Sequence, residues 1–267
     1  MITADQVKAL REKTGAGMMD CKRALTAANG DMEAAIEQLR KSGIAKAEKK
    51  AARTTSEGKI ACSINGKTGA MIELLCETDF AAKSDKFLAF VADSVGKTAA
   101  LAGNGDVTEA ANAAIADELV SKIATIGENM QLRRAVRWEA QGDLYSYLHG
   151  EGRIGVMIEA EGAASEELLK DICMHIAAFR PEFINPEDIP AEKIAKEREI
   201  ALASDPKMAG KPAQMIEKIL DGKINKWMGE VALMRQPWIR DDKSCLAKLY
   251  PQLKVVRFAR WEVGEEL

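Results

Sequence analysis

The spacing of apolar residues at the start of the chain predicts three short helices. Thr3 and Gln6 have the spacing of a capping box, which begins a first helix. Apolar residues then recur at every third or fourth position over 18–28 and again after Asp31, a favourable N-cap residue. We expect the third helix to end at Gly43, because glycine commonly follows the last helical residue.

Three helices in so short a segment form only a small core and resemble a bundle of the ubiquitin-associated type. Such bundles usually bind another protein through the loop between the first two helices. In this chain the loop leads into Met18 and Met19, which cannot both face one core because neighbouring helical residues point about 100° apart. We expect at least one of them to be exposed, either as an adaptable contact or incidentally.

Basic residues and alanines dominate the segment 40–57, which we interpret as a helical linker in solvent. Phosphate binding is the alternative, since lysine and arginine neutralise phosphates. Alanines rather than aromatic residues separate these charges. The sequence therefore favours a linker and predicts no direct contact with nucleic acid.

Alternating apolar residues after the linker predict a β-hairpin. Its turn lies at 65–69, and the apolar run 70–76 returns as the second strand. The run stops at Thr78 and Asp79, two residues that favour helix caps, and Phe80 follows. One aromatic ring therefore lies at a corner between a strand and a helix, beside an acid.

Phe80 either fills the core or points outward toward a partner. Phenylalanine is usually buried, and an unbroken helix would place Phe80 on the same face as Phe87, seven residues later. Ser84 can cap a new helix between them. The expected apolar face of that new helix consists of Phe87, Leu88, Val91 and Val95.

The next elements repeat the order of the first hairpin and its helix. An amphipathic helix that ends at Gly127 and a strand over 131–139 complete the first set. A second hairpin over 144–160 follows, and then a helix capped by Ser165. Each hairpin carries a Gly-x-Met-Ile-Glu pattern at the same place. We interpret the two sets as related subdomains.

The pattern changes after residue 181. Two charged helices, separated by proline and glycine breaks at 205–212, predict an α-hairpin over 182–228. This hairpin either pairs with a copy of itself, which gives a homodimer, or stands in solvent. A last strand within 249–263 is expected to complete the second sheet.

These patterns predict an α+β fold: an N-terminal three-helix, ubiquitin-associated-like module, then two related subdomains of antiparallel sheet plus helices, with an inserted helical hairpin. The predicted divisions are residues 1–54 for the module and linker, 55–140 for the first subdomain with the Thr-Asp-Phe corner, 141–181 with 229–267 for the second subdomain, and 182–228 for the hairpin.

The composition and the N-terminal residues indicate in which compartment the protein is located. No apolar run approaches the roughly 20 residues of a membrane span, and the N-terminus lacks a signal-peptide pattern. We therefore expect a cytoplasmic protein that does not contact membranes. A net charge of -3 gives no general attraction for nucleic acid. The 5 cysteines are an odd number without a C-x-x-C pair, so we expect buried free thiols.

Motifs for catalysis or cofactor binding are missing. Gly-Lys-Thr occurs at 66–68 and 96–98, but Ala61 and Val91 stand where a phosphate-binding loop requires its first glycine. With 2 histidines, the chain has little means for acid–base or metal chemistry. We expect a binding protein that is not an enzyme and holds no cofactor or metal.

Two segments carry a specific resemblance to a known family. Leu10–Lys22 is similar to the N-terminal signature of the elongation factor Ts family, and Cys76–Phe80 is similar to its second signature. Shorter likenesses lie at 149–155, 174–178, 229–237 and 263–265. The resemblance spans nearly the whole chain.

The resemblance implies a guanine-nucleotide exchange factor that binds the GDP form of elongation factor Tu and releases GDP during translation elongation. It implies that the corner dislocates Mg²⁺ in the partner through Thr78, Asp79, Phe80 and Ala81. The other implied partner contacts are Arg11, Met18, Met19, His149 and Gly150. The alternative is an adaptor without exchange activity, which binds a protein partner through the three-helix module.

Two positions depart from the family's pattern. Leu75 stands where asparagine is frequent, which we interpret as a change in packing. Many members continue into a further C-terminal helix after the segment around Gly264. We expect any partner contact of that helix to be absent here.

Overall fold

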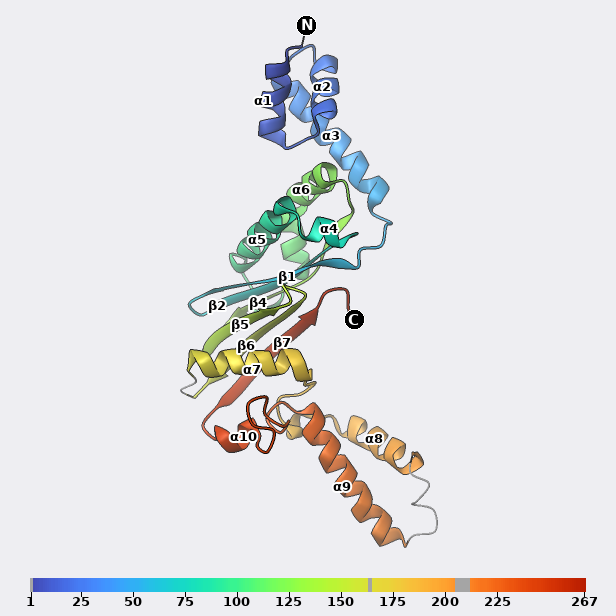
Figure 1. The fold of residues 1–267 in the computed structure, drawn as a ribbon, viewed down its shortest axis with the longest axis vertical. Coiled ribbons are helices and arrows are strands. Elements are labelled where there is room, and N and C mark those ends of the chain that lie inside the picture. The colour runs from blue at the N-terminus through green and yellow to red at the C-terminus, as the bar shows by residue number, and fades with distance from the viewer. Residues whose placement is uncertain (1, 163–164, 205–211) are drawn as a thin grey trace. The chain divides into compact units, whose positions relative to one another are not determined.

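The computed structural model describes residues 2–162, 165–204 and 212–267 (Figure 1). The elements are, in chain order, α1 (Ala4–Thr14), α2 (Met18–Ala27), α3 (Met32–Lys50), β1 (Glu57–Asn65), β2 (Thr68–Cys76), α4 (Asp79–Ala82), α5 (Asp85–Ala99), β3 (Gly105–Asp106), α6 (Thr108–Ile126), β4 (Met130–Glu139), β5 (Asp143–His149), β6 (Ile154–Glu161), α7 (Glu166–Phe179), a 3-10 turn η1 (Pro186–Asp188), α8 (Ala191–Ala203), α9 (Ala213–Val231), α10 (Leu246–Leu249) and β7 (Lys254–Glu262).

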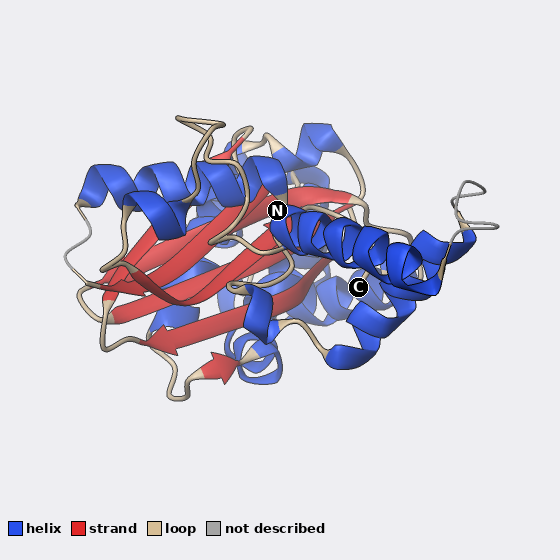
Figure 2. Cartoon of the chain, turned by 90° about the horizontal axis from the view of Figure 1, so that it is seen from below, coloured by secondary structure: helices blue, strands red, loops and turns tan. Residues whose placement is uncertain are grey.

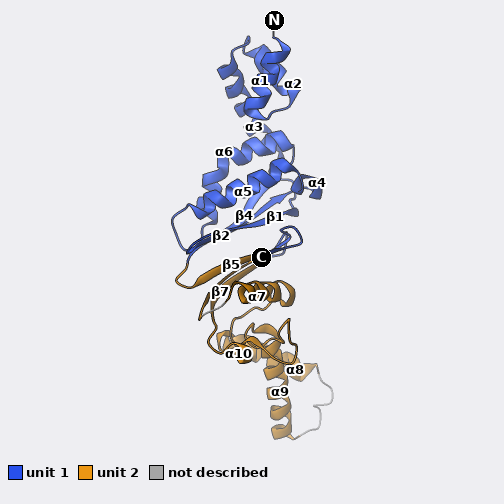
Figure 3. Cartoon of the chain, turned by 60° about the vertical axis from the view of Figure 1, so that its left-hand side comes forward, with its two compact units in different colours: residues 1–139, 148–155, 261–267 blue, residues 140–147, 156–260 orange. Residues whose placement is uncertain are grey.

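The chain forms two compact units (Figure 3). The first unit comprises Met1–Glu139, Leu148–Gly155 and Trp261–Leu267, and the second comprises Ala140–Tyr147 and Val156–Arg260. The finer division into four parts stays a prediction.

The first unit contains a sheet with strand order β1-β2-β4-β3, in which the paired strands are antiparallel. Strands β1 and β2 form the predicted hairpin, with Ile60 opposite Glu73. Helices α5 and α6 pack on this sheet (Figure 1). Figure 2 shows the helices of the chain in blue and its strands in red. Phe87 and Phe90 of α5 are fully buried in the core between helices and sheet.

The three-helix module has a small core of its own, whose members include Leu10, Cys21 and Leu25. The capping box of Thr3 and its neighbour three residues later is present, and the side chain of Asp31 caps α3, as the sequence predicts. These local bonds satisfy backbone N–H groups that the first helical turn leaves free. The module therefore follows from its own sequence.

Gly43 does not end the third helix, so this prediction is wrong. Helix α3 continues to Lys50, and Gly43 is buried within it. A Cβ atom at Gly43 would lie 3.5 Å from the Cβ of Ala124 on α6. The glycine therefore permits close packing of α3 against α6, which outweighs its cost of about 1 kcal/mol inside a helix.

The second unit holds a sheet with strand order β5-β6-β7, in which β7 is the predicted last strand. Helix α7 lies against this sheet, and the Arg260 guanidinium of β7 donates a 3.3 Å hydrogen bond to the carbonyl of Ala177. The side chain of Ser165 caps α7, as predicted. The segment between α9 and β7 contains α10, which the sequence pattern did not predict.

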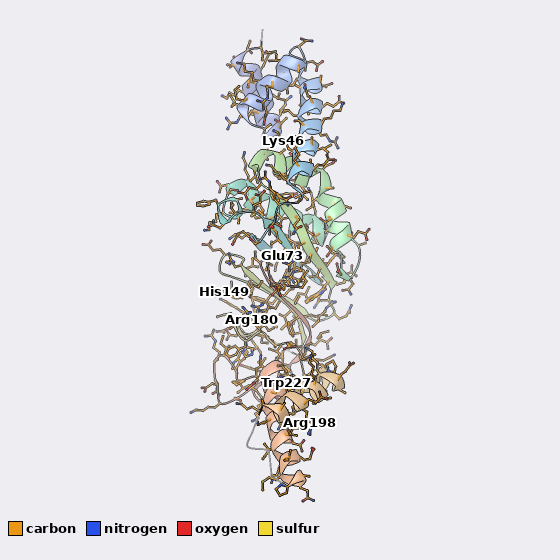
Figure 4. All side chains as sticks on the ribbon, turned by 90° about the vertical axis from the view of Figure 1, so that its right-hand side faces the viewer. Lys46, Glu73, His149, Arg180, Arg198 and Trp227 are labelled. Carbon is orange, nitrogen blue, oxygen red and sulfur yellow. The ribbon has the colours of Figure 1, made fainter. Side chains whose placement is uncertain are left out.

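Helices α8 and α9 form the predicted hairpin. Ala201 and Leu220 meet in a small apolar cluster, and Arg198, labelled in Figure 4, donates a 3.0 Å hydrogen bond to Asp221. The predicted breaks at 205–211 lie outside the described residues, and Pro212 precedes α9. Helix α9 continues to Val231, beyond the predicted limit of 228.

Two predictions of burial are wrong in part. Leu88 is 41% exposed, because it lies next to Phe87 on the helix and points about 100° away from the core. Phe90, which the predicted face did not include, is fully buried. Among the cysteines, Cys62 and Cys245 are only half-buried, although all five are free thiols.

The fold class is confirmed as α+β, with N-terminal helices followed by antiparallel sheets and their helices, and a helical hairpin within the second unit. Across the ranges that the structure describes, every helix is too short or too polar to cross a lipid bilayer.

Candidate functional site

The corner between β2 and α4 is fixed by hydrogen bonds of Thr78. Its side-chain oxygen accepts a 3.2 Å hydrogen bond from the N–H of Ala81 and caps the single turn of α4. Its hydroxyl donates to Oε1 of Glu128 at 2.6 Å, and its N–H donates to Oε2 at 3.0 Å. One carboxylate therefore holds both donors of Thr78.

Phe80 projects from this corner and is 83% exposed. The next two residues, Ala81 and Ala82, are buried against the core of the first unit. The turn of α4 therefore has one face in the core and presents the aromatic ring on the other. Ser84 caps α5 at its first residues, so the helix is broken between Phe80 and Phe87, and the two rings do not share a face.

Asp79 and Lys83 form an ion pair beside the ring. The Nζ atom of Lys83 donates a 2.8 Å hydrogen bond to Asp79 Oδ2. This hydrogen bond lowers the pKa of Asp79 and raises the pKa of Lys83. Both groups are therefore charged at neutral pH, and the corner presents a negative and a positive group next to Phe80.

The loop between α6 and β4 supports the corner from behind. Asn129 donates a 2.6 Å hydrogen bond from its N–H to Glu77, and its side-chain amide donates to the carbonyl of Arg53 at 2.8 Å. Asn129 is buried. The loop thus connects the segment after α3 to the residues directly before Thr78.

The thiol of Cys76 completes the support. It is fully buried and donates to the carbonyl of Thr78 with a sulfur–oxygen distance of 3.2 Å. Burial, followed by the charge of Glu128, raises its pKa to about 12. The thiol therefore stays protonated near neutral pH and has a structural role.

A polar cleft of about 300 Å³ adjoins the corner. Asp79 and Lys83 line one side, and Gly150 lines the other, from the turn between β5 and β6. Lys59 lies within the lining and donates from Nζ to the carbonyl of Glu151 at 2.5 Å. The structure thus brings Gly150, proposed from the sequence, to the same cleft as the Thr-Asp-Phe corner.

The turn at 150–152 is held close to β1. The N–H of Ile60 donates a 2.8 Å hydrogen bond to the carbonyl of Gly152. At Gly152 the φ angle is +88°, and a Cβ atom would lie 2.9 Å from the Ile60 carbonyl oxygen. Glycine is therefore required here. His149 precedes the turn at the end of β5 and is exposed (Figure 4).

Arg11, Met18 and Met19 lie on a different surface, at α1 and the first turn of α2. Met18 is 45% exposed and Met19 is 62% exposed, so both methionines are available for contact. The predicted site residues therefore form two groups, one on the three-helix module and one around the corner and its cleft.

The basic residues after α2 are largely engaged within the protein. Lys46, labelled in Figure 4, donates to Asp20 at 2.9 Å, and Arg40 donates to Asp117 at 3.0 Å. Lys50 donates to the carbonyl of Gly127. These bonds join α3 to α2 and to the region of α6. They also pair part of the positive charge of α3 with acceptors inside the protein.

His175 contributes to packing inside the second unit. Its ring stacks on Phe179 and Trp238 and is buried, which lowers its pKa. The amide of Gln236 donates to the carbonyls of Phe179 and Glu230, so its oxygen faces His175 Nε2 at 2.9 Å. Within the described ranges no three His, Cys, Asp or Glu side chains are arranged to hold a metal ion.

Sequence reasoning missed Glu128 and Asn129. Both follow Gly127, which ends α6 as predicted. Their hydrogen-bond partners lie at least fifty residues away in the sequence, and neither helical nor strand periodicity can reveal such a pairing. The only local signal is two polar residues placed between a helix end and an apolar strand.

The fold and the site define a protein that presents a fixed, protruding aromatic residue beside a polar cleft, a geometry typical of surfaces that bind other proteins. The family model described as Elongation factor TS matches residues 77–265. The chain is 46% identical to the Elongation factor Ts of Methylococcus capsulatus and 48% identical to those of Thioalkalivibrio sulfidiphilus and Escherichia coli. Each comparison covers 99% of this chain and 92% of the relative. The chain belongs to the elongation factor Ts family.

Proposed function

We propose that this chain is a guanine-nucleotide exchange factor that binds the GDP form of elongation factor Tu and releases GDP during translation elongation. The observation that carries the proposal is Phe80, 83% exposed on a corner whose backbone is held by several hydrogen bonds. An exposed aromatic residue gains free energy when a partner covers it, and aromatic residues dominate protein-binding hot spots.

The exchange works by linkage between two binding equilibria. A GTPase that holds GDP with nanomolar affinity has about 12 kcal/mol of binding free energy, and a thousandfold weakening requires about 4 kcal/mol. Insertion of Phe80 near the magnesium site of the partner supplies this energy, because Mg²⁺ and phosphate contacts require accurate geometry. The coupling is reciprocal, so bound nucleotide lowers the affinity of the partner for the exchange factor by the same factor.

The proposed contacts have different roles. Phe80 enters the partner, and Asp79 disturbs polar groups near the magnesium ion. Thr78 and Ala81 set the position of the ring through the cap of α4. Arg11, Met18 and Met19 anchor the partner on the three-helix module, and His149 with Gly150 contacts it beside the cleft.

This activity involves no bond-making by the chain, so the protein is not an enzyme in the usual sense and needs no cofactor or metal of its own. An adaptor that binds through the three-helix module alone would also use Met18 and Met19. It would give no role to the exposed ring of Phe80, which is the reason to prefer exchange.

The test is a stopped-flow measurement of fluorescent GDP released from elongation factor Tu on addition of the full chain. We expect release to accelerate with concentration and to reach a plateau. The complex should also dissociate when excess GDP is added, because of the reciprocal coupling. Binding to elongation factor Tu without acceleration of release would favour the adaptor.

Three further assignments belong with this proposal. The four-part division at 1–54, 55–140, 141–181 with 229–267, and 182–228 is proposed from the sequence pattern, and so is a cytoplasmic location. A homodimer formed through 182–228 also stays a prediction, and sedimentation of the full chain over a range of concentrations tests it.

A further inference from the structure

Glu128 lies outside the sequence signatures of the corner and has no direct place in the proposed contacts. We infer that Glu128 is a positioning residue for exchange: it sets the direction in which Phe80 projects, by holding Thr78 with both carboxylate oxygens. The inference rests on the proposed exchange function, and its test is designed so that the two can fail separately.

The hydrogen bonds form a chain that fixes a single orientation of the Thr78 side chain. The hydroxyl gives its only proton to Glu128 Oε1 at 2.6 Å, which leaves its lone pairs for the N–H of Ala81 at 3.2 Å. The N–H of Thr78 donates to the other oxygen at 3.0 Å. A charged acceptor makes such bonds shorter and stronger than neutral ones.

The short length of α4 makes Phe80 depend on this cap. The helix has only the four residues Asp79–Ala82, and a single turn has few internal hydrogen bonds to hold its direction. Phe80 is its second residue and, being 83% exposed, has little packing of its own to orient it. Burial of Ala81 and Ala82 holds one face of the turn, and the cap residue with whatever holds it sets the start of the turn, from which the ring projects.

Glu128 is itself fixed on both sides. Gly127, with a φ angle of +93°, ends α6 by donating from its N–H to the carbonyl of Ile123. On the other side, buried Asn129 is bound to Glu77 and to the carbonyl of Arg53. The carboxylate is therefore presented to Thr78 from a rigid backbone, as a pre-organised site requires.

The test compares Glu128→Ala with Glu128→Gln in the stopped-flow release of fluorescent GDP from elongation factor Tu. Glutamine keeps one oxygen that can accept from Thr78, so it should restore part of the activity. For Glu128→Ala we expect the plateau rate of release to fall at least about tenfold, because small misplacements of a positioned group have effects of this size or larger. The chain concentration at half-plateau should change less than about threefold, because the contacts of Met18 and Met19 remain.

A double-mutant cycle with Phe80→Ala separates positioning from general loss of structure. If Glu128 acts through Phe80, adding Glu128→Ala to Phe80→Ala causes little further loss. Glu109→Ala, at an exposed position in the first turn of α6, is the control and should release GDP as the unmodified chain does. Circular dichroism checks that each variant is folded.

The outcomes distinguish the two claims. A Glu128→Ala variant with an unchanged plateau overturns the positioning role, and so does a second equal loss in the Phe80→Ala background. If folded Phe80→Ala itself releases GDP normally, the proposed insertion of Phe80 is what fails. A loss seen in the half-plateau concentration alone would assign Glu128 to general binding and would also overturn the inference.

Discussion

Phe80 and Phe87 offer an internal comparison of an exposed and a buried ring in the same unit. Phe80 is 83% exposed, whereas Phe87 is fully buried in the core under α5. Full burial of a phenylalanine side chain contributes about 1.5–3 kcal/mol. Since only about a sixth of Phe80 is buried, truncation to alanine removes at most about 0.5 kcal/mol of stability.

Alanine also has a higher helix propensity than phenylalanine, which offsets part of this loss in α4. We therefore expect Phe80→Ala to change the free energy of unfolding by less than about 0.5 kcal/mol. Phe87→Ala should cost about 3–5 kcal/mol, because it leaves a cavity in a packed core.

Urea unfolding followed by circular dichroism measures both values in the same assay, with the slope of the transition as a check that the unfolded states are comparable. A loss above about 2 kcal/mol for Phe80→Ala would mean that the ring packs in the core, as its residue type alone suggests. That result would refute the assignment of Phe80 to the surface.

Two further predictions concern buried polar groups. Glu73, labelled in Figure 4, is fully buried and accepts hydrogen bonds from Arg134 at 2.6 Å and from the N–H of Gly264 at 2.9 Å. Glu73→Ala should cost about 3 kcal/mol in urea unfolding, since it removes the buried carboxylate that pairs with Arg134 and accepts from the N–H of Gly264, and a loss below about 1 kcal/mol would contradict this. Burial lowers the pKa of His175 in the folded protein. As the pH falls, the unfolded chain therefore binds the proton before the folded chain does. The contribution of His175 to the free energy of unfolding is thus present above about pH 6.5 and is lost progressively below it. Between about pH 6.5 and about pH 5.5 we expect the free energy of unfolding to fall, and the fall to persist in His149→Gln; a slope that disappears in that variant would assign it to the other histidine.

Local signals in the sequence predicted most of the fold. The capping residues Thr3, Asp31 and Ser84 each begin a helix where the sequence places one. Short apolar segments on either side of glycine-containing turns predicted both hairpins, and the continuous apolar runs correspond to β2 and β6, which are buried on both faces. These features depend on neighbours within a few residues, and a single sequence carries that information.

The wrong and missing predictions concern residues whose role depends on contacts with a segment far away in the sequence. Gly43 has the appearance of a helix end, but the approach of Ala124 on α6 makes it a packing position. Glu128 could not be connected to Thr78, because the pairing depends on how the α6–β4 loop meets the corner. The exposure of Phe80 was inferred from the family resemblance, since residue type alone favours the core.

Phe80 is proposed to act on the partner rather than on the stability of the fold. The most direct test is the plateau rate of GDP release from elongation factor Tu with folded Phe80→Ala, compared with Leu88→Ala, which removes another exposed apolar side chain of the first unit. Insertion of the ring is proposed to supply about 4 kcal/mol of nucleotide weakening, and loss of half of this, about 2 kcal/mol, corresponds to about thirtyfold in the release rate. We predict at least this loss for Phe80→Ala and none for Leu88→Ala, whereas an unchanged plateau rate with folded Phe80→Ala would show that the ring does not act on the partner.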